Sequence, residues 1–355
     1  KTDLMLASAS CFPEPMFVLS GFSAFQALPA KGSGKPSLPF ERDTAGLTPG
    51  EGGAVIVLKR LADAERDGDR IYGTLLGAHV SNAGTGLPLK PDMPSELKCL
   101  SDTYAKFGIE PASMQYVECH ATGTPQGDAC EIKAIRGAFV DQGAPMPQIG
   151  STKGHFGHTL VAAGFAGCAK LMLSFKHGTI PAGPKFELAM DRHVVTRNSP
   201  WPATATPGAP KRAGLSAFGF GGTNAHAVFE EYRGKTAPHA GLMKVATPQP
   251  LAIVGMAAHF GALSSLEQLE GALYAGTDGS CELPPKRWRF LQKDETFRNA
   301  LLADDAEGSL RGCFVQEIEV DHMRLKLPML PEDQLQAQQL LALTTIDKAL
   351  IDSGV

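Results

Sequence analysis

The sequence lacks a hydrophobic run that could cross a membrane. The longest candidate, residues 160–175, is interrupted by Gly164, Gly167 and Lys170, whereas a spanning helix needs about 20 predominantly apolar residues. An excess of basic residues is also lacking, because the 355 residues carry a formal net charge of −4. Nucleic-acid-binding domains usually present a basic surface, so the composition does not suggest that function.

The sequence has no C-x-x-C motif. Its cysteines are odd in number and scattered, which is typical of reduced thiols rather than of a disulfide framework, and this indicates a cytoplasmic protein. The seven are Cys11, Cys99, Cys119, Cys130, Cys168, Cys281 and Cys313. The chain begins without Met, and its last residues follow a helical pattern. We therefore interpret it as a piece of a longer polypeptide.

What is present is typical of a globular protein, with 43% hydrophobic and 20% charged residues. The length suits two domains or one large α/β domain. Up to residue 233, short β-type runs alternate with helical stretches, which favours a layered α/β fold. The predicted strands are 54–61, 70–80, 114–120, 147–152, 213–220 and 225–232, and the predicted helices are 95–108 and 128–140.

Residues 234–249 break this alternation. They are polar and contain proline, as linkers often do. From residue 250 a buried strand, a glycine turn and an amphipathic helix start the pattern afresh. We therefore predict a first domain over 1–233, a linker over 234–249 and a second, truncated domain over 250–355.

Three clusters combine a strand end with small residues and polar side chains. Loops that follow strands commonly carry the sites of α/β proteins. Glycines in such loops let a ligand or a backbone amide approach closely. The clusters are 118–128 with His120, 151–159 with Lys153, His155 and His158, and 216–226 with Phe220, Gly221, Gly222, Thr223 and Asn224.

His158 and His120 each have two interpretations. Gly157 precedes His158 and an apolar helical run follows it, so we place His158 in the first turn of a helix. The positive potential there disfavours an imidazolium, and a neutral ring can donate an N–H to a developing enolate. The alternative is a capping histidine without a chemical task. His120 ends a strand and is either catalytic or a satisfied, partly buried histidine.

Lys153 precedes two glycines and a buried helix, so we expect it to be partly buried. It would then need an acidic partner, either Glu131 or Asp128; the alternative is a solvated lysine. His155 and His158 have a spacing that metal sites use, but no third ligand of matching pattern lies nearby, and we expect no metal.

The run "GFGGT" is not a phosphate-binding loop, because it lacks the G-K-[ST] of a Walker A motif and does not open a helix. The backbone N–H groups of a glycine-rich turn can instead form an oxyanion hole. Paired histidines that face a carbonyl suggest acyl or carbanion chemistry, which usually needs a covalent nucleophile. No cysteine lies in a tight turn that opens a helix. The residues alone therefore indicate an incomplete acyl-chemistry site.

The three clusters, in this order, resemble the C-terminal half of a β-ketoacyl synthase, the condensing domain of polyketide and fatty-acid synthases. "VECHATGTPQGDACEIKAI" is similar to the family's V-E-x-H-G-T-G-T-x-x-G-D-x-x-E. "GSTKGHFGHTLVAAGFAG" is similar to K-S-N-I-G-H-T-x-A-A-A-G, and "LSAFGFGGTNAHAVFEE" to S-S-F-G-F-G-G-T-N-A-H-x-x-x-E-E. The segment "LPFERDTAGLTPGEGGAVIVLKRL" resembles the one that precedes them. The resemblance covers residues 1–233.

The resemblance implies a role for each matching residue. His120 and His158 would hydrogen-bond the malonyl thioester carbonyl during decarboxylation. Lys153 would orient His120 and balance charge, with Glu131 and Asp128 in support. The remaining implied residues are Phe220 and Gly221 at the gate and oxyanion hole, and Thr122 and Thr124 on the phosphopantetheine arm.

Several positions depart from the family pattern. The nucleophile motif D-x-A-C-[SA] would lie upstream of Lys1, so we expect no nucleophile in this chain and no condensation by the chain alone. His155 replaces the usual Asn and Ala121 replaces Gly; we favour a His155 ring that points away from the pocket over a spare polar group in it. Gly167 replaces the Glu of single-function bacterial enzymes, which agrees with the polyketide-type branch.

The second part resembles the start of the same family. "PLAIVGMAAHFGALSSLEQLEGALYAG" and "LPPKRWRF" match its opening segments, whereas "QAQQL" departs from D-P-Q-Q-R at Ala337 and Leu340. Two such domains in tandem, the second divergent, resemble the ketosynthase and chain-length factor of polyunsaturated fatty-acid synthases. The alternatives are a modular type I polyketide synthase, a thiolase, and a non-catalytic acyl-binding pseudoenzyme; the last is our preferred interpretation of the second domain.

The resemblance implies a thiolase-like fold with αβαβα layers and duplicated halves, here an incomplete first domain and a truncated second one. It implies an acyltransferase in the intact parent, with malonyl and acyl thioesters as substrates. No cofactor is expected, because phosphopantetheine arrives on acyl carrier protein. A homodimer or a ketosynthase/chain-length-factor pair is the expected assembly.

Overall fold

The computed structural model describes residues 3–12, 19, 21–23, 25–29, 37–84, 91–184, 186–219, 221–234, 251–284, 295, 311–316, 318–325 and 337–354. The strands are β1 (Leu4–Cys11), β2 (Gly52–Arg60), β3 (Gly73–Asn82), β4 (Tyr116–Glu118), β5 (Gln148–Gly150), β6 (Thr179–Ile180), β7 (Ser199–Pro200), β8 (Arg212–Phe218), β9 (Thr223–Glu230), β10 (Leu251–Phe260), β11 (Cys281–Glu282) and β12 (Arg311–Gly312). The α-helices are α2 (Leu61–Asp67), α3 (Met93–Phe107), α4 (Pro125–Phe139), α5 (Lys153–Phe156), α6 (Ala163–His177), α7 (Leu266–Ala275) and α9 (Ala337–Ser353). Short 3-10 turns lie at Pro111–Ser113, Val140–Gln142 and Leu160–Ala162.

The predicted strands and helices of the first part are confirmed, with shifted ends. The helix predicted from residue 128 begins at Pro125, a residue that fits the first helical turn because its missing N–H would have no helical partner there. The strand predicted at 114–120 is reduced to β4. The strands predicted at 213–220 and 225–232 form the antiparallel pair β8 and β9 around a glycine-rich turn.

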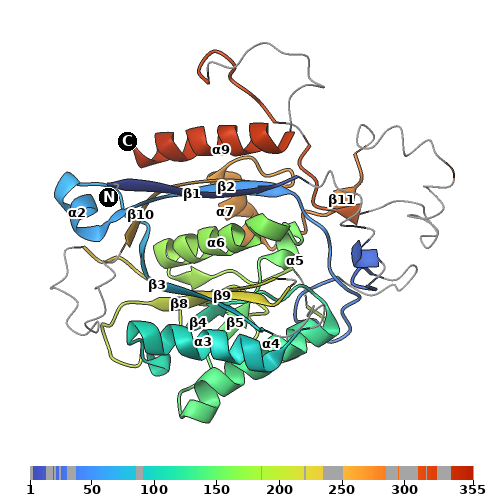
Figure 1. Cartoon of the computed structure of the whole chain (residues 1–355), viewed down its shortest axis with the longest axis vertical. Coiled ribbons are helices and arrows are strands. Elements are labelled where there is room, and N and C mark those ends of the chain that lie inside the picture. Colours follow the sequence, from blue (N-terminus) through green and yellow to red (C-terminus); the bar gives the residue numbers. More distant parts are fainter. Residues whose placement is uncertain are drawn as a thin grey trace.

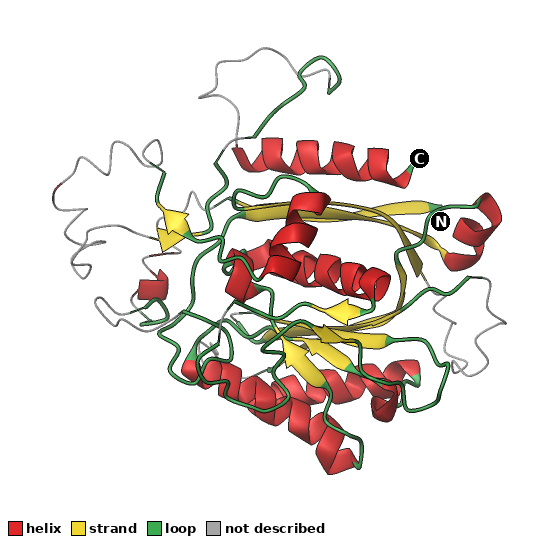
Figure 2. Cartoon of the chain, turned by 180° about the vertical axis from the view of Figure 1, so that it is seen from behind, coloured by secondary structure: helices red, strands yellow, loops and turns green. Residues whose placement is uncertain are grey.

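One long sheet folds over a central helix. Its strand order is β1-β2-β10-β3-β9-β8-β4-β5, and β10 meets β3 over only three residue pairs, Leu251–Ile253 with Gly73–Leu75. At that narrow junction the sheet bends, so that β1, β2 and β10 face β9, β8 and β4 across α6 (Figure 1). With α9 outside one half and α3 and α4 outside the other, the layers run α, β, α, β, α (Figures 1 and 2).

The central helix α6 is apolar almost all round, as a helix between two sheet layers must be. Leu171, Met172 and Phe175 pack in one cluster with residues of both sheet halves, among them Phe229 of β9 and Ile253 of β10. A separate cluster joins α3 and α4 to β4, and a third joins α9 to β2 and β10. No helix in the described ranges is long and apolar enough to cross a membrane.

The strand predicted to open a second domain lies inside the same sheet as the first part. β10 pairs antiparallel with β2 on one side and with β3 on the other. Residues 235–250, which include most of the predicted linker, lie outside the described residues. The division of the chain at residues 233 and 250 stays a prediction.

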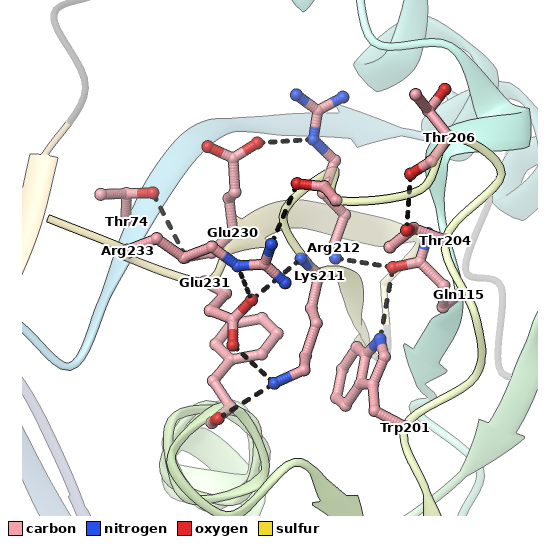
Figure 3. A network of polar contacts seen from close by, with 12 residues as sticks. Thr74, Gln115, Trp201, Thr204, Thr206, Lys211, Arg212, Glu230, Glu231 and Arg233 are labelled. Carbon is pink, nitrogen blue, oxygen red and sulfur yellow. Dashed lines mark hydrogen bonds and ion pairs between the residues drawn. The ribbon is translucent and has the colours of Figure 1, made fainter. Parts of the chain in front are cut away.

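The ends of β8 and β9 opposite their glycine turn are joined by charged side chains (Figure 3). Arg212 contacts Glu230 at 2.7 Å, and the Lys211 ammonium and the Arg233 guanidinium both contact Glu231 at 2.5 Å. This network fixes the register of the hairpin at the far end from the polar clusters.

We expect Gly255→Ala to destabilise the protein by about 1–3 kcal/mol, the usual range for an overpacked core. A Cβ at Gly255 would lie 2.7 Å from the Ala349 carbonyl oxygen and 2.6 Å from Ser353 Cβ, so α9 would have to move off β10. The measurement is the free energy of unfolding in urea.

Gly271→Ala is the matched control in the same part of the chain. Gly271 lies within α7 with no atom within 4 Å of its added Cβ, so alanine should stabilise by about 0.5–1 kcal/mol through helix propensity. Equal stability of Gly255→Ala and the wild type would contradict the packing of α9 on β10.

Candidate active site

The three polar clusters meet at one edge of the sheet. β4 pairs in parallel with β5 on one side and with β8 on the other, so the carboxyl ends of all three strands lie side by side. His120 follows β4, Lys153 follows β5, and the turn 219–222 follows β8. Open α/β sheets place ligands at such edges, which is where we locate the candidate site.

Two histidine rings form the centre of the site. The ring centroids of His120 and His158 are 5.3 Å apart with an interplanar angle of 80°. Phe218, the last residue of β8, lies 5.9 Å from His120 between ring centroids. His158 and Phe218, which lie 38 and 98 residues after His120 in the chain, therefore both place their rings next to the ring of His120.

The prediction that His158 lies in the first turn of a helix is wrong. α5 ends at Phe156, and α6 begins only at Ala163. Between them Gly157 adopts a φ of +67°, and a Cβ there would lie 2.7 Å from the Pro49 carbonyl oxygen. The chain leaves the helical path at this glycine so that His158 can pair with the segment at Pro49.

Backbone hydrogen bonds hold His158 on both sides. Its N–H donates to the Thr48 carbonyl at 2.7 Å, and its carbonyl accepts from the Gly50 N–H at 3.1 Å. Its Nδ1 accepts the Leu160 N–H at 3.2 Å. Leu160 reaches this position with a φ of +47°, a left-handed conformation that is costly for a side chain other than glycine. With Nδ1 an acceptor, the proton of a neutral His158 ring resides on Nε2.

Both rings are neutral at physiological pH. Burial, with a smaller contribution from the positive charge of Lys153, lowers the pKa of His158 to about 3. The pKa of His120 is well below its ordinary value because of burial and the nearby Lys153 and His158. The neutral state of His158, which we predicted from the positive potential at a helix end, thus arises from burial of the ring and from the positive charge of Lys153.

Lys153 is buried, with 7% of its surface exposed. Burial lowers its pKa, and the negative charges of Glu118, Glu131 and Asp128 oppose that effect, with Glu118 the strongest. Among the described ion pairs none joins Lys153 to a carboxylate within 4.0 Å. The expected partners Glu131 and Asp128 therefore act on the ammonium through space.

The side chain of Glu131 holds the loop at His120 by accepting hydrogen bonds from the backbone of that loop. One carboxylate oxygen accepts the His120 N–H at 2.8 Å and the other accepts the Ala121 N–H at 2.7 Å. The side chain is buried, and burial raises its pKa to about 7 against the opposing effect of these two hydrogen bonds.

Asp128 joins the same loop to a distant segment. Oδ1 accepts the N–H groups of Thr122 and Gly123 at 3.0 and 3.2 Å, and Oδ2 accepts the Phe40 N–H at 2.7 Å. Phe40 is another non-glycine residue with a left-handed backbone, at a φ of +65°. Burial raises the pKa of Asp128 to about 6.

The other predicted residues are placed as follows. The hydroxyls of Thr122 and Thr124 lie 3.1 Å apart, and Gly221 lies in the β8–β9 turn with a φ of +88°. Phe220 lies outside the described residues. The His155 ring is buried, with Nδ1 3.0 Å from the Thr277 carbonyl and Nε2 2.8 Å from the Ala182 carbonyl. Both His155 ring nitrogens are thus engaged by backbone carbonyls, and the roles assigned to the other residues stay predictions.

Sequence reasoning missed Glu118. Its carboxylate is buried directly before the His120 loop and has the largest favourable influence on Lys153. The signal was available, because Glu118 is a charged residue in a strand of otherwise apolar character, and Lys170 is a lone charge in the apolar run that became α6. Among the residues with described positions, no group of three or more His, Cys, Asp or Glu could hold a metal ion.

Five alternating layers with paired neutral imidazoles and a buried lysine at the strand ends define a thiolase-like ketosynthase architecture. The chain belongs to the β-ketoacyl synthase family. It matches the description "Beta-ketoacyl synthase, C-terminal domain" over residues 72–187. The description "Beta-ketoacyl synthase, N-terminal domain" matches over residues 1–64 and again over 249–355.

Similar proteins include two different subunits of a polyunsaturated fatty acid synthase from Thraustochytrium sp. One of these subunits is 54% identical over 99% of this chain and 17% of its own length. The other is 32% identical over 88% of this chain and 12% of its own length. The chain thus spans less than a fifth of the length of these curated relatives.

Solved structures show the same fold. The structure titled "PfaC Keto synthase-Chain length factor" aligns with a TM-score of 0.62 and 34% identity, covering 100% of this chain and 37% of that one. The ketosynthase from module 6 of the bacillaene synthase of Bacillus subtilis 168 aligns with a TM-score of 0.60 and 27% identity, covering 85% and 61%. These findings confirm the predicted family and fold class.

We expect the His158 ring to stay neutral between pH 5 and 8, because its pKa of about 3 lies below that range. The measurement is a pH titration by NMR with ¹⁵N-labelled histidine, with the His158 signals assigned from a His158→Gln variant. They should report a proton on Nε2 throughout. The control is the protein in denaturant, where each histidine should titrate near its ordinary pKa of about 6.5. A midpoint between pH 6 and 7 for folded His158 would contradict the site described above.

Proposed function

We propose that this chain supplies the decarboxylation site of a polyunsaturated fatty-acid synthase that condenses malonyl units, carried on acyl carrier protein, with a growing acyl thioester. The observation that carries the proposal is the pair of neutral rings of His120 and His158, 5.3 Å apart at the carboxyl edge of parallel strands. Two neutral imidazole N–H groups that converge are suited to a single carbonyl oxygen on which negative charge develops.

The chemical steps follow from that placement. The malonyl carboxylate leaves as carbon dioxide, and the electrons of the broken C–C bond pass to the α-carbon and the thioester oxygen. His120 and His158 donate hydrogen bonds to that enolate oxygen. The α-carbon then attacks the carbonyl carbon of an acyl thioester, and the thiolate leaves from the resulting oxyanion. Burial, with a smaller contribution from the positive charge of Lys153, keeps both rings neutral, and each neutral ring still carries one N–H that it can donate to the substrate oxygen.

The acyl nucleophile of this proposal lies outside the chain. Burial raises the pKa of six cysteines in it, so these thiols are poor sources of a thiolate. They are Cys11, Cys99, Cys119, Cys130, Cys168 and Cys313. The family resemblance supports an upstream cysteine on the same parent polypeptide.

The partners and setting are part of the same proposal. Acyl carrier protein delivers the phosphopantetheine arm past Thr122, Thr124 and Gly221, and no resident cofactor is needed because the charge is held by protein hydrogen bonds. The similarity to the solved keto synthase–chain length factor supports a ketosynthase/chain-length-factor pair as the assembly. All seven cysteines are free thiols, which supports a cytoplasmic location.

We expect His158→Ala and His120→Ala each to lower malonyl decarboxylation by about a hundredfold or more, the usual scale for one positioned acid–base or oxyanion group. The assay follows labelled carbon dioxide released from malonyl-carrier protein by the full-length parent.

His177→Ala is the control, because His177 lies at the opposite end of α6, where it contacts Glu270. It should retain wild-type decarboxylation. Unchanged rates in both site variants would show that the histidine pair is structural and that the parent is a pseudoenzyme at this position.

A further inference from the structure

A complete ion pair is buried in the centre of the molecule, behind the site. The Lys170 ammonium of α6 lies 2.8 Å from Glu118 Oε2, and both side chains are 1% exposed. Lys170 also donates to the Tyr116 hydroxyl at 2.7 Å, and that hydroxyl donates to Glu118 Oε2 at 2.7 Å. A buried pair of this kind often stabilises a fold no more than apolar residues would. Stability alone does not account for it.

Two glycines leave the space that this group fills. A Cβ at Gly150 of β5 would lie 2.5 Å from the Tyr116 hydroxyl and 3.4 Å from Lys170 Nζ. A Cβ at Gly167 of α6 would lie 2.6 Å from Leu215 Cδ1 and 2.9 Å from Glu118 Cγ. Glycine inside a helix costs about 1 kcal/mol relative to alanine. Gly167 therefore makes α6 less stable, but it leaves space for the side chains of Glu118 and Leu215.

The second carboxylate oxygen of Glu118 accepts a hydrogen bond from the turn that carries Lys153. Oε1 accepts the Thr152 N–H at 2.6 Å, and Thr152 directly precedes Lys153. The ion pair occupies Oε2 while Oε1 faces the turn, so the carboxylate has one fixed orientation. The same carboxylate has the strongest favourable influence on the Lys153 charge.

We propose that Lys170 and Glu118 are positioning residues for the decarboxylation site: their buried ion pair, completed by Tyr116, holds Glu118 on the Thr152 N–H and so fixes the turn that carries Lys153. The inference rests on the proposed function for its catalytic part. Its structural part, the hold on the turn, stands on the contacts alone.

The titratable groups around Lys153 come from three elements. β4 and the loop after it contribute Glu118, Cys119 and His120, helix α4 contributes Asp128 and Glu131, and the loop before α6 contributes His158. Of these, only Glu118 is paired with a further cation in the described structure. Changes to the Lys170–Glu118 pair therefore alter the charge near Lys153 without touching the histidines or α4.

The first test is amide hydrogen exchange of the segment 152–157 in the full-length protein. Lys170→Met should speed exchange of the Thr152 amide about tenfold, because Glu118 loses the partner that orients it. Tyr116→Phe, a milder change that keeps the ion pair, should have a smaller effect of the same sign. The double variant Glu118→Gln with Lys170→Met should exchange about as fast as Lys170→Met, because the carboxamide also lacks the cation that orients residue 118.

Arg212→Met is the matched control. It breaks the contact of Arg212 with the buried Glu230 at the far end of β8 (Figure 3), and it should leave exchange of 152–157 unchanged. If Lys170→Met and Tyr116→Phe leave exchange of that segment as slow as Arg212→Met does, the proposal is wrong. It is also wrong if the double variant exchanges at the wild-type rate, because the effect of Lys170→Met would then come from an unpaired buried charge and not from the orientation of residue 118.

The second test is the pH profile of decarboxylation. Lys170→Met should lower kcat about tenfold with KM within about twofold. It removes a positive charge near Lys153, so the pKa of Lys153 rises and the basic limb of the profile moves to higher pH. The double variant removes the main counter-charge of Lys153, so the pKa falls and the basic limb moves to lower pH. A purely structural pair would shift neither limb.

The two readouts separate this inference from the proposed function. A parent that releases no carbon dioxide would overturn the proposed function, whereas exchange at Thr152 would still decide whether Lys170 and Glu118 hold the turn. An active parent with an unshifted profile and unchanged exchange would overturn the inference alone.

Discussion

Buried carboxylates that accept backbone N–H groups hold the candidate site together. Glu131 takes two N–H groups of the His120 loop, Asp128 takes three from two segments, and Glu118 takes the Thr152 N–H. A charged acceptor strengthens such hydrogen bonds, and burial keeps water from competing for them. The loop after β4, the turn after β5 and the segment at Phe40 are thereby each fixed by a buried carboxylate.

The same carboxylates set the charge state of the site. They offset the burial of the Lys153 ammonium, and the ammonium in turn disfavours protonation of His120 and His158. A second cation, Lys170, holds the carboxylate of Glu118 from behind. Positive and negative groups therefore alternate from Lys170 of α6 through Glu118 of β4 to Lys153, and the neutral rings of His120 and His158 follow Lys153.

The sequence predicted the fold class from the alternation of strands and helices, and it predicted that each cluster follows a strand. The parallel pairing of β4 with β5 and β8, which brings the clusters together, is a long-range feature that the sequence pattern does not contain. The sequence misplaced His158 because the apolar run after it reads as one helix, whereas Gly157 and the left-handed Leu160 interrupt the path. It assigned Glu131 and Asp128 to Lys153 as ion-pair partners because spacing does not show that their oxygens are taken by backbone N–H groups. The place of β10 between β2 and β3 is a long-range pairing, which periodicity does not encode.

The most direct test of the account is a crystal structure of the full-length protein with a non-hydrolysable malonyl thioester on the phosphopantetheine arm. The account predicts that the thioester carbonyl oxygen lies within hydrogen-bond distance of ring nitrogens of both His120 and His158, with Lys153 behind them and no direct contact to the ligand. An arm that binds elsewhere, or a carbonyl that contacts neither ring, would contradict it.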